Sequence, residues 1–161
     1  MEYENQAFLR SSELFRTLWR VNLSMRRIVQ KSAADNNLSV PQYAVLMTLT
    51  PRKEMTQKQL GTVMQFPKST LSQAVEGLVQ AGLIIRHPVK ENRREMQLII
   101  SEKGKTLYET IKRKEGSIHH AFESAIDTLS VKQYEELLCS LRQIASFLED
   151  ESEENGEDKH D

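Results

Sequence analysis

The chain has 161 residues, 39% hydrophobic and 28% charged, a composition that suits one globular domain with helical extensions. Its single cysteine excludes an internal disulfide framework and a cysteine-based metal cluster. No apolar run approaches the roughly 20 residues of a membrane helix, and the N-terminus lacks the apolar core of a signal peptide, so we expect a cytoplasmic protein.

The formal net charge of −1 conceals two segments of opposite sign. Residues 149–161 hold eight acids and one lysine, and we expect this tail to be disordered because it has nothing to bury. Residues 52–94 hold eight basic and three acidic residues, a net charge of +5. Such a concentration of basic charge indicates a polyanionic partner, although a solvated basic face fits the charge equally well.

The first predicted element is one long helix over residues 8–34. Its apolar residues recur at spacings of four and three, which places them on one face: Leu14, Leu18, Val21, Met25 and Ile28. So extensive a stripe needs a large partner surface.

Three later helices begin with a hydroxyl residue that is followed, three positions on, by glutamine. This is the capping-box pattern, and it occurs at Ser39, Thr56 and Ser130. The first of these three helices is predicted over 40–49. The proline at 51 ends it, because the residue before proline avoids helical geometry. The second is predicted over about 56–63.

A further helix is predicted to begin at Pro67 and to end at Gly82, where a left-handed cap is typical. The strand signals follow in 83–85 and 96–100, joined by the polar loop 87–94. They predict a hairpin with a basic tip. Helices return over 101–129, where a charged patch at 112–115 interrupts the apolar stripe, and over 130–148.

Two short helices in tandem before a basic hairpin are typical of a winged helix-turn-helix. We therefore expect a mainly α fold with a small two- or three-stranded β-wing. Residues 1–148 would form a single module, with a DNA-binding lobe over 38–100, its wing at 86–97, and dimerisation helices over 8–34 and 101–148.

The candidate DNA-binding residues lie on the helix from Pro67 and at the hairpin tip. A helix that enters the major groove needs polar side chains on its exposed face, and arginine is attracted into a narrow minor groove. The helix offers Lys68, Ser69, Thr70, Ser72 and Gln73, and the hairpin offers Lys90, Asn92, Arg93 and Arg94.

The run from Leu38 to Gly104 resembles the DNA-binding core of the multiple-antibiotic-resistance regulator (MarR) family. The matching pieces are LSVPQYAVL, MTQKQLGTVMQFPKSTLSQAVEGLVQAGLIIR and NRREMQLIISEKGK. The resemblance implies a two-fold dimer, binding to a pseudo-palindromic operator, and repression that a small ligand or an oxidant relieves.

By position, the resemblance makes Pro67 to Gln73 the groove-reading turn and Arg94 the wing arginine. Two positions depart from the family pattern. Asn92 stands where many members have an acid that orients the arginine, and Gln73 stands where many have an arginine. Because glutamine cannot make the bidentate guanine contact of arginine, we expect a different operator preference.

Several residues allow two interpretations. Trp19, Tyr43 and Met47 either line a cavity for a small aromatic or phenolic effector, as the resemblance suggests, or belong to the core. Cys139 reads as a small core residue rather than an oxidant sensor. His119 and Glu123 share a helix face, but a metal site would need further ligands, so we expect a solvated pair and no metal.

No phosphate-binding glycine loop, HExxH motif or nucleophile elbow occurs in the chain, so we expect neither an enzyme nor a cofactor. The alternative to a DNA-binding regulator is a non-catalytic protein-interaction adaptor built on a winged helix.

Overall fold

The computed structural model describes the backbone of residues 2–90 and 92–157, and the side chains of residues 6–90, 92 and 94–151. The chain divides into two compact units, residues 1–120 and 121–161. The expectation of a single module over 1–148 stays a prediction. None of the helices in the described ranges is long and apolar enough to cross a membrane.

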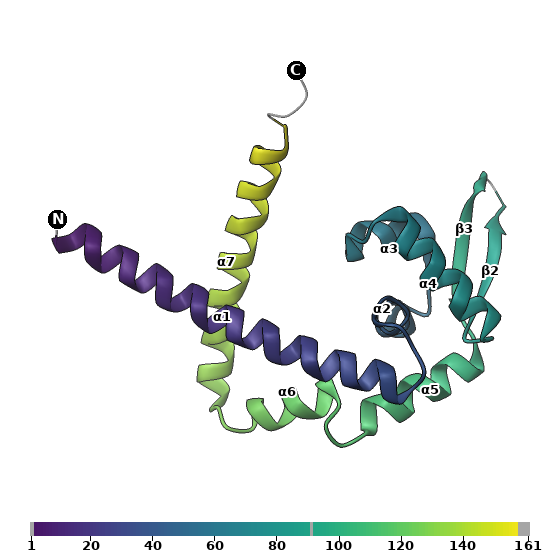
Figure 1. Cartoon of the computed structure of the whole chain (residues 1–161), viewed down its shortest axis with the longest axis horizontal. Helices are drawn as coiled ribbons and strands as arrows, with labels where there is room; N and C mark the ends of the chain where they lie inside the picture. Colours follow the sequence, from purple (N-terminus) through teal and green to yellow (C-terminus); the bar gives the residue numbers. More distant parts are fainter. Residues whose placement is uncertain (1, 91, 158–161) are drawn as a thin grey trace. The chain divides into compact units, whose positions relative to one another are not determined.

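The protein is mainly helical with one small antiparallel sheet, as the sequence predicts (Figure 1). In chain order the elements are α1 (Glu2–Asp35), α2 (Val40–Leu49), the 3-10 turn η1 (Thr50–Arg52), β1 (Glu54–Thr56), α3 (Gln57–Met64), α4 (Lys68–Gln80), β2 (Ile84–Val89), β3 (Asn92–Ile100), α5 (Glu102–Arg113), α6 (Ile118–Ile126) and α7 (Val131–Glu157).

All three predicted capping boxes are present. At the start of α2, the Gln42 amide N–H donates to Ser39 Oγ at 3.2 Å, and the Ser39 N–H donates to Gln42 Oε1 at 2.8 Å. The same reciprocal pair forms at Thr56 before α3 and at Ser130 before α7. Each box satisfies backbone donors that the first helical turn leaves unpaired, which is why the sequence locates these helix starts well.

The core of the first unit is built around α2. This helix is apolar on all sides, and it contacts α1, α3, α4, α5 and β3. The largest completely buried side chains come from five of these elements and from β2: Leu46 and Leu49, Leu60, Leu78, Ile84, Leu98 and Ile111. The polar faces of α3 and α4 remain outside this core.

The sheet has the order β1-β3-β2, and both pairings are antiparallel. The sequence reading missed β1, which is only three residues long and contributes Met55 to the core opposite Leu98. It also made the hairpin strands too short, because β2 runs on to Val89 and β3 begins at Asn92. These polar residues belong to strands because backbone pairing does not require apolar side chains.

Helix α2 ends at Leu49, as predicted, although Thr50 keeps helical geometry before the proline and the chain continues as η1. Other helices differ from the prediction. The helix expected over 101–129 is broken after Arg113, and Gly116 with φ +77° turns the chain before α6. The first helix begins at Glu2 rather than at residue 8.

The acidic tail also departs from its prediction. Helix α7 continues to Glu157, so residues 149–157 are helical rather than disordered, and only residues 158–161 lie outside the described range. Glutamate has good intrinsic helix propensity, and an extension of an existing helix avoids the cost of nucleation.

Candidate nucleic-acid interface

A tight turn joins α3 to α4. Gln65 adopts the left-handed conformation with φ 50° and ends α3, where its N–H donates to the Gly61 carbonyl at 2.9 Å. Phe66 packs against the core, and Pro67 takes the extended geometry of the residue before α4. The two short helices are thereby held as a helix-turn-helix.

Helix α4 presents the two faces that the sequence predicts. Leu71, Ala74, Val75 and Leu78 are buried. Ser69, Ser72, Gln73 and Glu76 are exposed, and Thr70 is half-buried. After the exposed Lys68 at the first position, the exposed side chains near the start of the helix are uncharged, and the free N–H groups there favour an anion.

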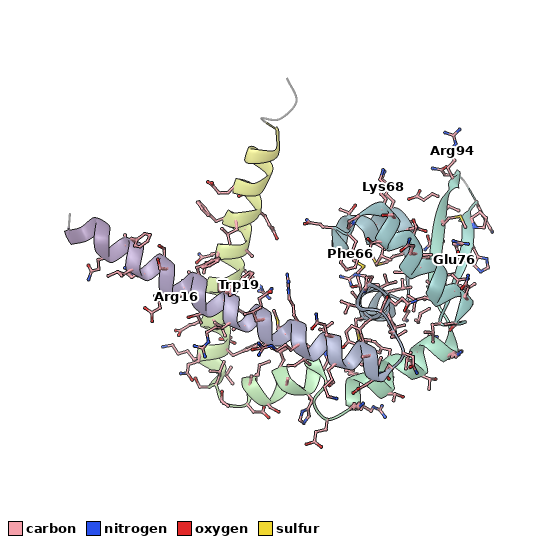
Figure 2. All side chains as sticks on the ribbon, in the orientation of Figure 1. Arg16, Trp19, Phe66, Lys68, Glu76 and Arg94 are labelled. Carbon is pink, nitrogen blue, oxygen red and sulfur yellow. The ribbon has the colours of Figure 1, made fainter. Side chains whose placement is uncertain are left out.

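The hairpin β2–β3 extends beyond the helices of its lobe (Figure 1). Arg94 lies toward its tip, and Figure 2 shows Arg94 and Lys68 reaching outward on the same side of the lobe. Both side chains are exposed. The start of α4 and the tip of the hairpin therefore present positive charge to one common surface.

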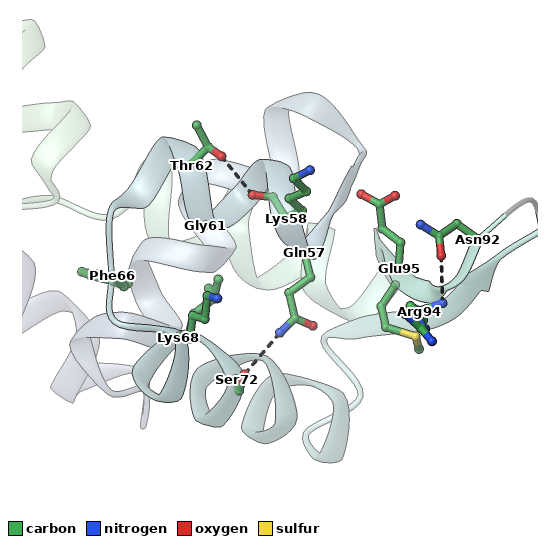
Figure 3. Close-up of a pocket in the computed structure, with 12 residues that line it drawn as sticks. Gln57, Lys58, Gly61, Thr62, Phe66, Lys68, Ser72, Asn92, Arg94 and Glu95 are labelled. Carbon is green, nitrogen blue, oxygen red and sulfur yellow. Dashed lines mark hydrogen bonds between the residues drawn. The ribbon is translucent and has the colours of Figure 1, made fainter. Parts of the chain in front are cut away.

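Between them lies an open pocket of about 720 Å³. Its walls come from α3, the start of α4 and β3 (Figure 3). Three cationic side chains line it: Lys58, Lys68 and Arg94. The pocket also has apolar walls at Phe66, Leu71 and Met96, and Glu95 is the one carboxylate among its described residues.

Three side-chain hydrogen bonds join described residues that line this pocket, and the first runs from Thr62 Oγ1 to the Lys58 carbonyl at 3.2 Å (Figure 3). Gln57 Nε2 donates to Ser72 Oγ at 3.4 Å and so links the first turn of α3 to the exposed face of α4. Asn92 Oδ1 accepts from the Arg94 N–H at 3.2 Å. The asparagine that replaces the usual acid therefore fixes the backbone of the hairpin turn, two residues along.

An ion pair connects the second half of α4 to strand β2 of the sheet. Arg86 on β2 lies 3.1 Å from a carboxylate oxygen of Glu76, and Gln80 donates to the other oxygen at 3.3 Å. Both partners of the pair are substantially exposed, so its contribution to stability is small. It orients Glu76 toward β2.

Four of the predicted DNA-binding residues meet at the pocket: Lys68, Ser72, Asn92 and Arg94. Ser69, Thr70 and Gln73 lie on α4 outside its lining, and Lys90 is exposed at the end of β2. The side chain of Arg93 lies outside the described part of the chain. Sequence reasoning missed Gln57, Lys58, Thr62 and Glu95. For the first two residues, the available signal was the capping box at Thr56. It places Gln57 and Lys58 in the first turn of α3.

The three residues that could line an effector cavity or belong to the core lie in different surroundings. Tyr43 is buried in the core, and its hydroxyl has no hydrogen-bond partner among the described residues. Met47 packs against the same core, whereas Trp19 is half exposed on α1 and stacks on Phe15 at a centroid distance of 6.1 Å. None of the three lines the pocket described above.

The remaining two positions are Cys139 and His119. Cys139 is exposed on α7, so the expectation of a small core residue is wrong for the isolated chain. His119 meets the ring of Tyr108 edge-on at a centroid distance of 6.4 Å.

A capped helix, a turn, a polar-faced helix and an antiparallel hairpin define a winged helix-turn-helix protein. Residues 36–95 match the MarR family. The central lobe is therefore similar to the MarR family.

Individual relatives agree with this assignment. The chain is 22% identical to YybA of Bacillus subtilis, an uncharacterised HTH-type transcriptional regulator, over 86% of this chain and 90% of the relative. It shares its fold with a MarR protein from Peptoclostridium difficile (TM-score 0.72, 18% identity, 86% and 88% of the two chains). It also shares its fold with a putative MarR-family regulator from Listeria monocytogenes, solved with a 26mer DNA (TM-score 0.71, 23% identity, 83% and 89%).

Proposed function

We propose that the chain is a DNA-binding transcriptional regulator: a cytoplasmic homodimeric repressor that binds a pseudo-palindromic operator. The observation that carries this proposal is the common surface formed by α4 and the hairpin. Lys58, Lys68 and Arg94 line one pocket there, beside the polar face of α4. The structural relative solved with a 26mer DNA supports the same interpretation.

The geometry suggests a division of roles on duplex DNA. A major groove admits one helix, and α4 offers hydroxyl groups and Gln73 to the base edges there. The hairpin then carries Arg94 toward the neighbouring minor groove, where a narrow groove has enhanced negative potential. Lys58 on α3 and Lys68 at the start of α4 would face the phosphates of the strand that separates the two grooves.

The test is DNA selection from a random pool, followed by affinity measurements at several salt concentrations. We expect a pseudo-palindrome with half-sites about 10–10.5 bp apart, because two recognition helices of a symmetric dimer meet successive major grooves. Each neutralised phosphate should contribute a slope of about −0.9 to the logarithm of affinity against that of salt. Binding without sequence preference or salt dependence would favour the protein-interaction adaptor.

A small aromatic or phenolic effector is the second part of the proposal. The buried Tyr43 hydroxyl without a partner supports it, because a buried polar group is normally hydrogen-bonded and a ligand or water can supply the missing contact. Such a ligand releases DNA only if it binds the DNA-free dimer more tightly. We expect it to quench Trp19 fluorescence and operator DNA to oppose the quenching. Equal quenching with and without operator would contradict ligand release.

A further inference from the structure

Among the described residues that line the pocket on this surface, Glu95 is the one acid. Its half-buried side chain comes from β3, between Arg94 and Met96. Figure 3 shows its carboxylate directed into the same space as the Lys58 and Asn92 side chains. A carboxylate here is chemically out of place, because an ionised carboxylate only accepts hydrogen bonds and a DNA phosphate offers no donor.

No described side chain forms an ion pair with this carboxylate, whereas Glu76 is paired with Arg86, Glu102 with Lys105 and Glu109 with Arg113. The three cations that line the pocket with Glu95 are spread over α3, α4 and β3. Its negative charge therefore remains available to act on whatever anion approaches this surface.

We propose that Glu95 is a negative determinant of DNA affinity: its carboxylate repels the phosphate strand that Lys58, Lys68 and Arg94 attract. The inference rests on the proposed function, since it concerns the same surface. Non-specific binding depends almost entirely on phosphate contacts, whereas an operator adds base contacts from α4. A fixed repulsion at the phosphates therefore weakens every complex, and only sequences with compensating base contacts remain bound at physiological salt.

The experiment compares the full-length wild type with Glu95→Gln and a matched control, Glu54→Gln. Glutamine keeps the size of glutamate and removes one negative charge. Glu54 is an exposed acid on β1 in the same lobe, and it does not line the pocket. Fluorescence anisotropy with the selected operator and with a scrambled duplex gives affinities over a salt series, and thermal unfolding verifies that the variants are folded.

We expect Glu95→Gln to bind both duplexes about three- to ten-fold more tightly at low salt, the effect of one like charge removed about 4 Å from a phosphate when water screens the pair. The salt slope should steepen by up to about 0.9 unit, and the gain should vanish at high salt. Glu54→Gln should change neither quantity appreciably, because its charge lies outside the pocket.

The other outcomes separate the two proposals. If wild-type protein binds DNA in a salt-dependent manner but Glu95→Gln behaves like Glu54→Gln, the role of Glu95 is refuted and the proposed function stands. Weaker binding by Glu95→Gln also refutes it, because the carboxylate would then accept a hydrogen bond from a base such as cytosine. If the wild type fails to bind duplex DNA at all, the proposed function itself is refuted.

Discussion

Gly104 occupies a place in the first turn of α5 where no side chain fits. A Cβ atom there would collide with the backbone carbonyl oxygen of Leu83 and would lie 2.5 Å from Cδ1 of Ile100. The Leu83 carbonyl cannot move freely, because it accepts hydrogen bonds from the Ser101 N–H at 3.1 Å and from Ser101 Oγ at 2.9 Å. The glycine thus allows the end of the hairpin to pack directly against the start of α5.

We therefore predict that Gly104→Ala lowers the free energy of unfolding by about 1–3 kcal/mol, the usual cost of overpacking. Urea denaturation followed by circular dichroism measures it. Gly61→Ala is the control, because a Cβ at this helical position meets only Cδ2 of Leu71 at an ordinary 3.4 Å. Greater helix propensity should make that variant neutral or slightly more stable. Equal stability of the two variants would show that the Leu83 carbonyl yields easily.

Asp35 joins the end of α1 to the end of α5. Its carboxylate lies 2.8 Å from Lys31 Nζ and 3.0 Å from Lys114 Nζ. Hydrogen bonds from Lys31 and Lys114 hold the pKa of Asp35 below its ordinary value. A lowered pKa in the folded state means that ionised Asp35 stabilises the fold.

The sign of the pH effect follows. The stabilisation is fully present above the unfolded-state pKa of about 4, and it is lost as the pH falls through the lower pKa of the folded state. We predict that Asp35→Asn lowers the urea midpoint near neutral pH and that its difference from wild type shrinks toward zero in acid below this window. A difference that persists unchanged in acid would assign the effect to packing rather than charge.

At the scale of elements, the starts of the helices with a capping box were predictable, and helix continuity was not. The capping boxes at Ser39, Thr56 and Ser130 are local, because each needs only two residues three positions apart, and all three form. The break before α6 depends on Gly116, whose left-handed geometry no periodicity reveals. β1 escaped notice because it forms only by pairing with β3, more than 40 residues away.

The candidate site, too, was only partly predictable from the sequence. The polar face of α4 follows from helical periodicity, so Lys68 and Ser72 could be assigned from the sequence. Lys58 and Glu95 could not, because their place in the pocket depends on how α3 and β3 approach α4 in space. Asn92 was identified, but its hydrogen bond to the Arg94 backbone depends on the geometry of the turn.

The recognition helix and the wing should contribute differently to binding. We predict that Gln73→Ala relaxes discrimination at one or two base positions, with a loss of roughly 1–3 kcal/mol for a bidentate adenine contact. Arg94→Ala should weaken binding to all sequences similarly and reduce the salt slope by about one unit, as expected for a backbone or groove-potential contact. Affinities for a panel of single-base operator variants measure both. Identical profiles for the two variants would show that the roles are wrongly assigned.

At the scale of the whole molecule, apolar surface is concentrated on the terminal helices. On α1, Phe8, Phe15 and Trp19 are each at least half exposed, and on α7 the same holds for Phe147 and Leu148. Isolated exposed hydrophobics are ordinary, but a continuous stripe along a helix indicates a binding surface. A second copy of the chain is the partner that a two-fold regulator requires.

We therefore predict a homodimer in which the exposed stripes are buried, with the interface near Leu14, Leu18, Ile118, Phe122, Leu141 and Ile144. Burial stabilises such an interface by about 25 cal/mol per Å² of apolar surface. Deletion of residues 1–30 should produce aggregates or unfolded monomer, as measured by sedimentation velocity and circular dichroism.

Point variants test the same prediction without removal of a helix. Leu14→Glu combined with Leu18→Glu places two charges in the apolar stripe of α1, and it should shift the sedimentation profile toward monomer and weaken operator binding. Arg16→Glu combined with Arg20→Glu alters the opposite side of the same helix, by the 3.6-residue periodicity, and should leave the protein dimeric. In the proposed dimer both copies of α4 must meet successive major grooves, so loss of the dimer should appear as loss of affinity for the two-half-site duplex. A folded, soluble monomer of wild-type protein that still binds the full operator would overturn this picture, because one lobe would then suffice for recognition.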